Sequence, residues 1–184
     1  MTHQITSKVI GQLTQDENFA DWWISNPFEI PFFDNDEFTI IFMGCVPEQD
    51  KTFIEEADSA LTNFFKLNAS YKNSISELAY KNLTNFMDAV SFNDVDKPLR
   101  EITNKNEIWK FIYPTKIYVA RRPYNEKDMY VQIVCECEWE QEHGLQFVFR
   151  QGKKLTRISD QDGHLTESDA YGKPDEEDDL LSKF

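Results

Sequence analysis

The strongest constraint on the fold of this chain is an alternation of apolar and polar side chains along residues 129–159. Successive side chains of a strand point to opposite faces of its sheet, so a period of two indicates half-buried strands. One predicted face carries Met129, Val131, Ile133, Cys135, Cys137 and Trp139. The same inner face continues with Leu145, Phe147 and Phe149. The stretch therefore predicts three consecutive antiparallel strands.

Two turns are expected to join these strands. Residues 140–144 form the predicted first loop, and residues 151–152 form a two-residue hairpin turn. With these turns Cys137 lies opposite Phe147, and Phe147 lies opposite Thr156. This register keeps the apolar side chains of all three strands on one face.

Short strands are predicted before residue 45, and helices after it. Residues 1–7 are expected to fray, and strands are expected at 9–13, 19–24, 28–30 and 38–43. Helical spacing of apolar residues predicts helices at 53–64 and 70–90. A loop at 91–100, a short helix that begins after Asn104 and a strand at 116–121 complete the middle of the chain.

These elements predict an α+β fold with an N-terminal β-meander, two to three central helices and a C-terminal antiparallel β-sheet. Residues 1–172 are expected to form a single α+β domain, a size at which one hydrophobic core suffices. Residues 173–184 are acidic and have little apolar periodicity. They are therefore expected to form a flexible tail whose removal leaves stability nearly unchanged.

The formal net charge of −14 limits the classes of partner. Binding to nucleic acid or to an anionic membrane requires clustered Lys and Arg, so neither is expected. An acidic chain is instead compatible with a basic protein partner. No glycine-rich phosphate loop is present, and no cofactor is expected. The sequence leaves the oligomeric state open.

The cysteine content favours a reducing compartment. The three cysteines are an odd number, and Cys135 and Cys137 lie two positions apart on one strand face, a poor geometry for a mutual disulfide. The first twenty residues lack a secretory signal pattern, and no apolar run approaches the ~20 residues of a membrane span. These features predict a cytoplasmic protein with reduced cysteines.

The densest polar group in the sequence consists of Glu136, Glu138, Glu140, Glu142 and His143. A carboxylate beside an imidazole can perform general acid–base chemistry, which makes Glu140, Glu142 and His143 the candidate catalytic residues. The same group of residues is also typical of an ordinary acidic surface, and this interpretation is favoured. Under it, Glu136 and Glu138 are candidates for binding a partner.

Metal binding is not expected. Cys135, Cys137 and His143 offer soft ligands, but zinc sites space their cysteines more widely and supply a fourth ligand. Residues 160–163 resemble part of a calcium loop, yet Ile158 would occupy its first ligand position. A simple turn explains the segment better, although ion binding at Asp160–Asp162 stays open.

Aromatic residues near the N-terminus add Trp22 and Trp23 as candidate binding residues. Core packing is the favoured role of this aromatic group, and a ligand-stacking surface is the alternative.

Several segments together resemble a group of small acidic bacterial proteins that share a domain of unknown function. The similar segments are residues 10–13, 22–23, 30–33, 139–145 and 149–152, including a Trp-Glu-x-Glu-His-Gly-Leu motif. The resemblance spans most of residues 8–170 and implies no established activity. Some similar bacterial proteins act as immunity factors against toxins, so the resemblance implies an immunity-like role.

Two functions follow as hypotheses. The favoured one is a non-enzymatic protein-binding module, immunity-like against a basic partner. The rival is a hydrolase or metal-assisted enzyme that uses Glu138, Glu140, Glu142 and His143. The rival requires these side chains to converge in a concave pocket.

Overall fold

The computed structural model describes residues 3–90 and 96–183, and its largest element is an eight-stranded sheet. In spatial order the strands are β1 (Gln4–Ser7), β2 (Gly11–Gln15), β3 (Trp23–Ser25), β6 (Ile40–Met43), β7 (Ile112–Arg121), β8 (Met129–Cys137), β9 (Leu145–Arg150) and β10 (Lys154–Ser159). Neighbouring strands are antiparallel except β6 and β7, which are parallel. The predicted α+β class is confirmed, and the two predicted strand groups join into one sheet.

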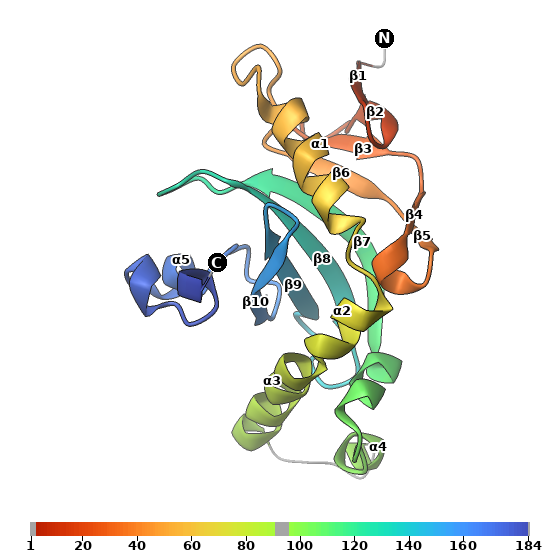
Figure 1. Ribbon diagram of the computed structural model, residues 1–184, viewed down its shortest axis with the longest axis vertical. Helices are drawn as coiled ribbons and strands as arrows, with labels where there is room; N and C mark the ends of the chain where they lie inside the picture. Colours follow the sequence, from red (N-terminus) through yellow and green to blue (C-terminus); the bar gives the residue numbers. More distant parts are fainter. Residues whose placement is uncertain (1–2, 91–95, 184) are drawn as a thin grey trace.

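The parallel pair requires a long crossover, which the central helices supply. Between β6 and β7 lie α1 (Phe53–Phe64), α2 (Ala69–Ser74), α3 (Ser76–Ala89), α4 (Lys97–Arg100) and the 3-10 helix η3 (Lys105–Phe111). In Figure 1, α1 runs across the central strands, and it packs against β7 and β8. We call the sheet face that carries this helix the inner face, and the opposite side the outer face.

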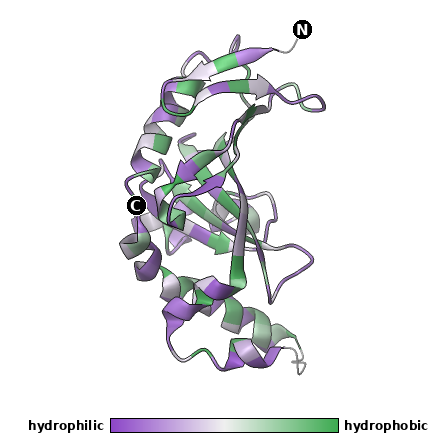
Figure 2. Ribbon diagram, turned by 90° about the vertical axis from the view of Figure 1, so that its right-hand side faces the viewer, coloured by the Kyte–Doolittle hydropathy of each residue, from purple (hydrophilic) through white to green (hydrophobic). Residues whose placement is uncertain are grey.

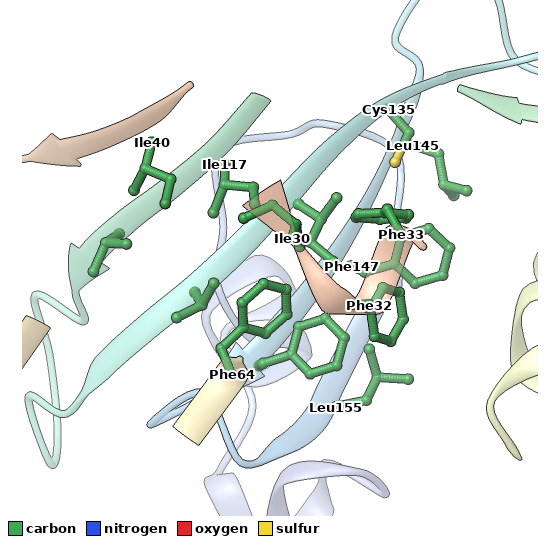
Figure 3. Packing of buried hydrophobic residues seen from close by; sticks show 14 of the residues in the cluster. Ile30, Phe32, Phe33, Ile40, Phe64, Ile117, Cys135, Leu145, Phe147 and Leu155 are labelled. Carbon is green, nitrogen blue, oxygen red and sulfur yellow. The ribbon is translucent and has the colours of Figure 1, made fainter. Parts of the chain in front are cut away.

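A small second sheet packs under the helices on the inner face. Its strands are β4 (Phe28–Ile30) and β5 (Asp36–Phe38), joined through the 3-10 helix η1 (Pro31–Phe33). Phe32 is fully buried and its ring centroid lies 6.0 Å from that of Phe64 in α1 and 5.8 Å from that of Phe149 in β9. Figure 3 shows the rings of Phe32 and Phe64 among the side chains packed over the strands. The aromatic-rich composition therefore serves one continuous core.

The chain after β10 returns to the outer face. This segment contains α5 (Glu167–Tyr171) and the 3-10 helices η4 (Asp175–Glu177) and η5 (Leu181–Lys183). It lies on the other side of the strands from α1 in Figure 1. Tyr130 and Val148, which alternate with the core residues of β8 and β9, form a small second cluster with Leu165. Figure 2 shows hydrophobic residues concentrated in the central strands and hydrophilic ones along the loops.

The predicted register between β8 and β9 is wrong. Phe147 pairs with Ile133 instead of Cys137, because β8 ends at Cys137 and the loop is longer than expected. Trp139 belongs to this loop and is 5% exposed, packed into the core. The shift covers an even number of residues, so the predicted inner face survives.

The predicted two-residue turn between β9 and β10 is also wrong. Arg150 pairs with Lys154, so three residues form the turn, and Phe147 pairs with Ile158 instead of Thr156. An irregularity at Thr156 adds one residue to β10, which lets Leu155 and Ile158 both face the core.

Several predicted boundaries change outside this hairpin. Residues 4–7, expected to fray, form β1, because their backbone pairs with β2. The expected helix at 70–90 is divided into α2 and α3 at Ile75, which is 5% exposed. Of the expected loop at 91–100, residues 91–95 lie outside the described residues and 97–100 form α4. The helix predicted at 53–64 is confirmed.

The last residues contact the body of the molecule. The carboxylate of Asp178 is fully buried and accepts backbone N–H groups of Glu167 at 3.0 Å and Ser168 at 3.2 Å. Leu181 is 3% exposed. The flexibility expected for 173–184 stays a prediction, and these contacts oppose it.

Candidate functional site

The five polar candidates gather around one hollow on the outer face, which we call the acidic pocket. Its volume is about 490 Å³. Its lining includes Glu136, Glu138, Glu140, Glu142 and His143, together with Tyr113 of β7. Glu136 projects from β8 opposite Tyr113, and the other four belong to the loop between β8 and β9. The structure thus brings the predicted candidates together.

Tyr113 forms the wall of this pocket beside the carboxylates. Its hydroxyl donates to Oε1 of Glu138 at 2.7 Å, and this hydrogen bond raises the pKa of Tyr113 above its usual value. Tyr113 is 45% exposed, so its ring remains available to a ligand. Sequence reasoning missed this residue, although its position across from Glu136 follows once the strand register is known.

Glu140 shapes the loop. Its Oε1 atom accepts the backbone N–H groups of Glu142 at 3.0 Å and His143 at 3.1 Å. The same oxygen lies 3.5 Å from Nδ1 of His143. Gly144 closes the loop with φ 65°, a left-handed conformation that glycine adopts without steric cost. The Glu140 carboxylate therefore stabilises the conformation of this loop.

Thiol chemistry is unfavourable in this pocket. Cys137 lines it, but burial raises the pKa of the Cys137 thiol to about 11. A thiol with this pKa stays protonated at neutral pH and is a poor nucleophile. Within residues 3–90 and 96–183, no three His, Cys, Asp or Glu side chains are grouped so as to hold a metal ion.

The two tryptophan candidates occupy different environments. Trp23 is 5% exposed, and its indole donates to the carbonyl of Cys45 at 2.8 Å inside the core. Trp23 is therefore a core residue and is not accessible to a partner. Trp22 is partly buried and is stacked on Phe19 with ring centroids 4.6 Å apart.

Trp22 belongs to a second hollow on the outer face, which we call the aromatic pocket. Its volume is about 340 Å³, and it is defined by Trp22, Tyr118, Tyr124, Gln132 and His164. Tyr118 and Gln132 are directly paired on β7 and β8 and form the floor. Sequence reasoning missed the pocket, because its walls come from segments far apart in the chain.

A buried ion network fixes the C-terminal wall of the aromatic pocket. Arg122 follows β7 and is fully buried. Its guanidinium binds Glu126 at 2.6 Å, Asp169 at 2.8 Å and Asp175 at 2.8 Å. Desolvation would lower the pKa of Arg122, but its hydrogen bonds to Asp169 and Asp175 and the charge of Glu126 raise it, so the residue stays charged. Asp169 lines the pocket, and Arg122 therefore positions it.

Asp162 lies in the segment that resembles a calcium loop. Its carboxylate forms an ion pair with a buried arginine. Burial would raise the pKa of Asp162, but hydrogen bonds from Arg157 lower it below its usual value. The Arg157–Asp162 contact is 2.8 Å long, and Arg157 is 2% exposed. The carboxylate of Asp162 therefore serves to hold the segment over the outer face.

Within the described residues, every helix is too short or too polar to cross a membrane. Comparisons with the curated proteins and with the solved structures give no match. A family model described as "Domain of unknown function (DUF6985)" matches residues 9–165. This range contains the acidic pocket and most of the aromatic pocket, and the chain belongs to this family of unknown function.

Proposed function

We propose that this protein is a non-enzymatic binding protein that takes a basic protein partner on the acidic pocket. The more specific form of the proposal is an immunity-like role, in which occupation of this pocket neutralises the partner. A cytoplasmic location suits the three buried free cysteines.

The observation that carries the proposal is a set of carboxylates that, in the described part of the chain, form no ion pair with Lys or Arg. Among the residues that the structure describes, the lining of the acidic pocket contains neither Lys nor Arg. Across the described ranges, Glu136, Glu138 and Glu142 form no ion pair with Lys or Arg, whereas Asp34, Glu56 and Asp162 do. Carboxylates grouped around a hollow produce a negative potential that attracts cations. A basic side chain in the pocket would relieve this repulsion and gain several charged partners.

The proposal is tested by neutralising the pocket without disturbing its shape. Glu136→Gln with Glu142→Gln removes two charges but keeps Glu140, which shapes the loop. The matched control is Glu29→Gln with Glu37→Gln, because these exposed carboxylates face each other in the small sheet on the inner side.

The measurement is fluorescence polarisation of a labelled lysine-rich peptide at several salt concentrations. We expect the pocket variant to bind roughly ten-fold more weakly, about 1.4 kcal/mol, with little change in the control. Equal weakening of both variants would show that net charge alone attracts the peptide, and the proposal would fail.

One observation favours the rival enzyme hypothesis. The Glu138, Glu140, Glu142 and His143 side chains do line a concave pocket, and the His143 Nδ1 atom lies 3.5 Å from the Glu140 carboxylate. His143 could then act as a general base on water in a hydrolysis. A broad screen of ester, amide and phosphoester substrates tests this. Turnover by the parent that is absent in a folded His143→Ala variant would replace the binding proposal.

A further inference from the structure

The aromatic pocket has the residue composition of a binding site rather than of a folding core. Tyr124 is 68% exposed, and Phe19, which stacks on Trp22, is 51% exposed. Trp22 also meets the ring of Tyr118 edge to face, with centroids 5.7 Å apart. Exposed Trp and Tyr side chains are characteristic of interaction surfaces, where their rings bury a large area at low entropic cost.

The charged groups at the wall of this pocket are already engaged. Arg121 bonds Asp50 through Nε at 3.0 Å and Glu56 through Nη1 at 2.6 Å. Asp169 bonds the buried Arg122. Among the described residues that line the pocket, the groups left for a ligand are therefore the aromatic rings, the side-chain amides and the imidazole of His164.

Two side-chain amides, those of Gln132 and Gln161, line the aromatic pocket. The amide nitrogen of Gln132 donates to Gln146, and that of Gln161 donates to the carbonyl of Cys135 at 2.9 Å. Within the described chain, the amide oxygens of Gln132 and Gln161 accept no hydrogen bond from another residue. Amide oxygens beside aromatic faces suit a positively charged hydrogen-bond donor, which gains both hydrogen bonds and cation–π attraction.

A cation–π contact within the chain already involves one ring of the aromatic pocket. The ammonium group of Lys116 lies 5.9 Å from the centroid of the Tyr118 ring. Tyr118 already attracts a cation of the same protein, and Lys116 stands beside the floor of the pocket as a competitor.

The aromatic pocket and the acidic pocket share one lining residue. Gln161 lines both. Along β8, Gln132 marks the first pocket and Glu136 the second, and both point to the outer face. Four residues of a strand span roughly 13 Å. An extended peptide places side chains four positions apart on one side at the same interval.

We propose that the aromatic pocket binds an arginine side chain of the partner, as a second subsite beside the acidic pocket. The partner segment crosses the outer face in an extended conformation, with a second basic residue four positions away in the acidic pocket. This inference rests on the proposed function, since it assigns the chemistry of the same partner.

The probe is a set of fluorescein-labelled Gly/Ser peptides measured by fluorescence polarisation. One peptide carries arginines four positions apart, a second carries them two positions apart, and a third replaces one arginine by citrulline, its neutral isostere. We expect the first peptide to bind the parent protein most tightly. Citrulline substitution is expected to weaken the affinity of the peptide about two- to five-fold, the scale of an exposed cation–π contact.

Protein variants locate the effect. Tyr124→Ala is expected to weaken the best peptide about two- to five-fold, and Trp22→Ala at least as much. Tyr171→Ala is the control, because Tyr171 is 76% exposed and lines neither pocket. Lys116→Gln removes the internal competitor and should tighten binding about two-fold.

Two results would overturn the inference in different ways. If Glu136→Gln with Glu142→Gln weakens every peptide while Trp22→Ala and Tyr124→Ala change none, the acidic pocket acts alone. The proposed function then stands without its second subsite. If spacing, citrulline and all pocket variants leave the affinities unchanged, both the subsite and the proposed function fail.

Discussion

The two faces of the eight-stranded sheet are both covered, but by different physical means. On the inner face, Phe32, Phe64 and Phe149 exclude water by direct ring contacts. On the outer face, the fully buried Arg122 and the 2%-exposed Arg157 hold the returning chain through carboxylates. The inner face is stabilised by burial of apolar area, and the outer face by ion pairs that must remain complete. The acidic pocket and the aromatic pocket both lie on the outer face.

The largest expected effect concerns the inner face. Phe147 is fully buried and stacks on Trp109 with ring centroids 5.2 Å apart. Phe147→Ala should cost about 3–5 kcal/mol, because it leaves a cavity between the sheet and η3. Urea denaturation measures this loss, with Phe19→Ala as the exposed control. Similar midpoints for the two variants would contradict the assignment of Phe147 to the core.

The next effect concerns the ion network of the outer face. Arg122→Met keeps the apolar volume but leaves Glu126, Asp169 and Asp175 without their common partner. We expect a loss of about 3 kcal/mol, at the lower limit for a buried pair because the carboxylates are partly exposed. Lys97→Met is the control, since Lys97 is 75% exposed and should matter little. An Arg122→Met protein as stable as the parent would show that apolar cover suffices on both faces.

The same contrast explains what the sequence could predict. Alternation along β8 identified the inner face correctly even though the register was displaced, because an even displacement preserves the face. The outer face has no comparable local signal. Arg122 meets Asp169 and Asp175 across 47 and 53 positions, and nothing near Arg122 in sequence indicates that it is buried.

The two pockets also differ in how far the sequence could predict them. The acidic pocket could be anticipated, because Glu136 to His143 are close together in the sequence. The aromatic pocket could not, because Trp22, Tyr118 and His164 meet only after the sheet and the returning segment are assembled. The irregularity at Thr156 was likewise hidden, since a single extra residue in a strand leaves no clear pattern.

A smaller effect tests how firmly the returning segment is attached. Deletion of residues 173–184 removes Asp175 from Arg122, together with the buried Asp178 and Leu181. We expect a loss of about 2 kcal/mol, which for a chain of this size lowers Tm by roughly 4–8 °C. The sequence pattern alone predicts almost no change, so a scanning calorimetry measurement decides between the two expectations.

The control for this deletion keeps the anchoring groups. A full-length variant with Glu176→Gln, Glu177→Gln and Asp179→Asn lowers the negative charge but retains Asp175, Asp178 and Leu181. It should melt close to the parent. An unchanged Tm in the deletion would show that the last residues contribute nothing to the outer face.

The smallest effects concern the loop of the acidic pocket, where two adjacent residues should behave differently. Gly144 has φ 65°, and a Cβ atom there would lie 2.6 Å from the carbonyl oxygen of Cys135. Gly144→Ala should therefore cost more than about 1 kcal/mol, from backbone strain and this clash together.

His143→Ala should cost less than about 0.5 kcal/mol, because the imidazole is 55% exposed and Glu140 shapes the loop through backbone N–H groups that the variant retains. Thermal melting of both variants measures the difference. A large loss in His143→Ala would mean that the imidazole, and not the Glu140 carboxylate, organises the loop. In that case any binding defect of this variant reports a collapsed pocket, and only substitutions at Glu136 and Glu142 can test the charge of the pocket on the outer face.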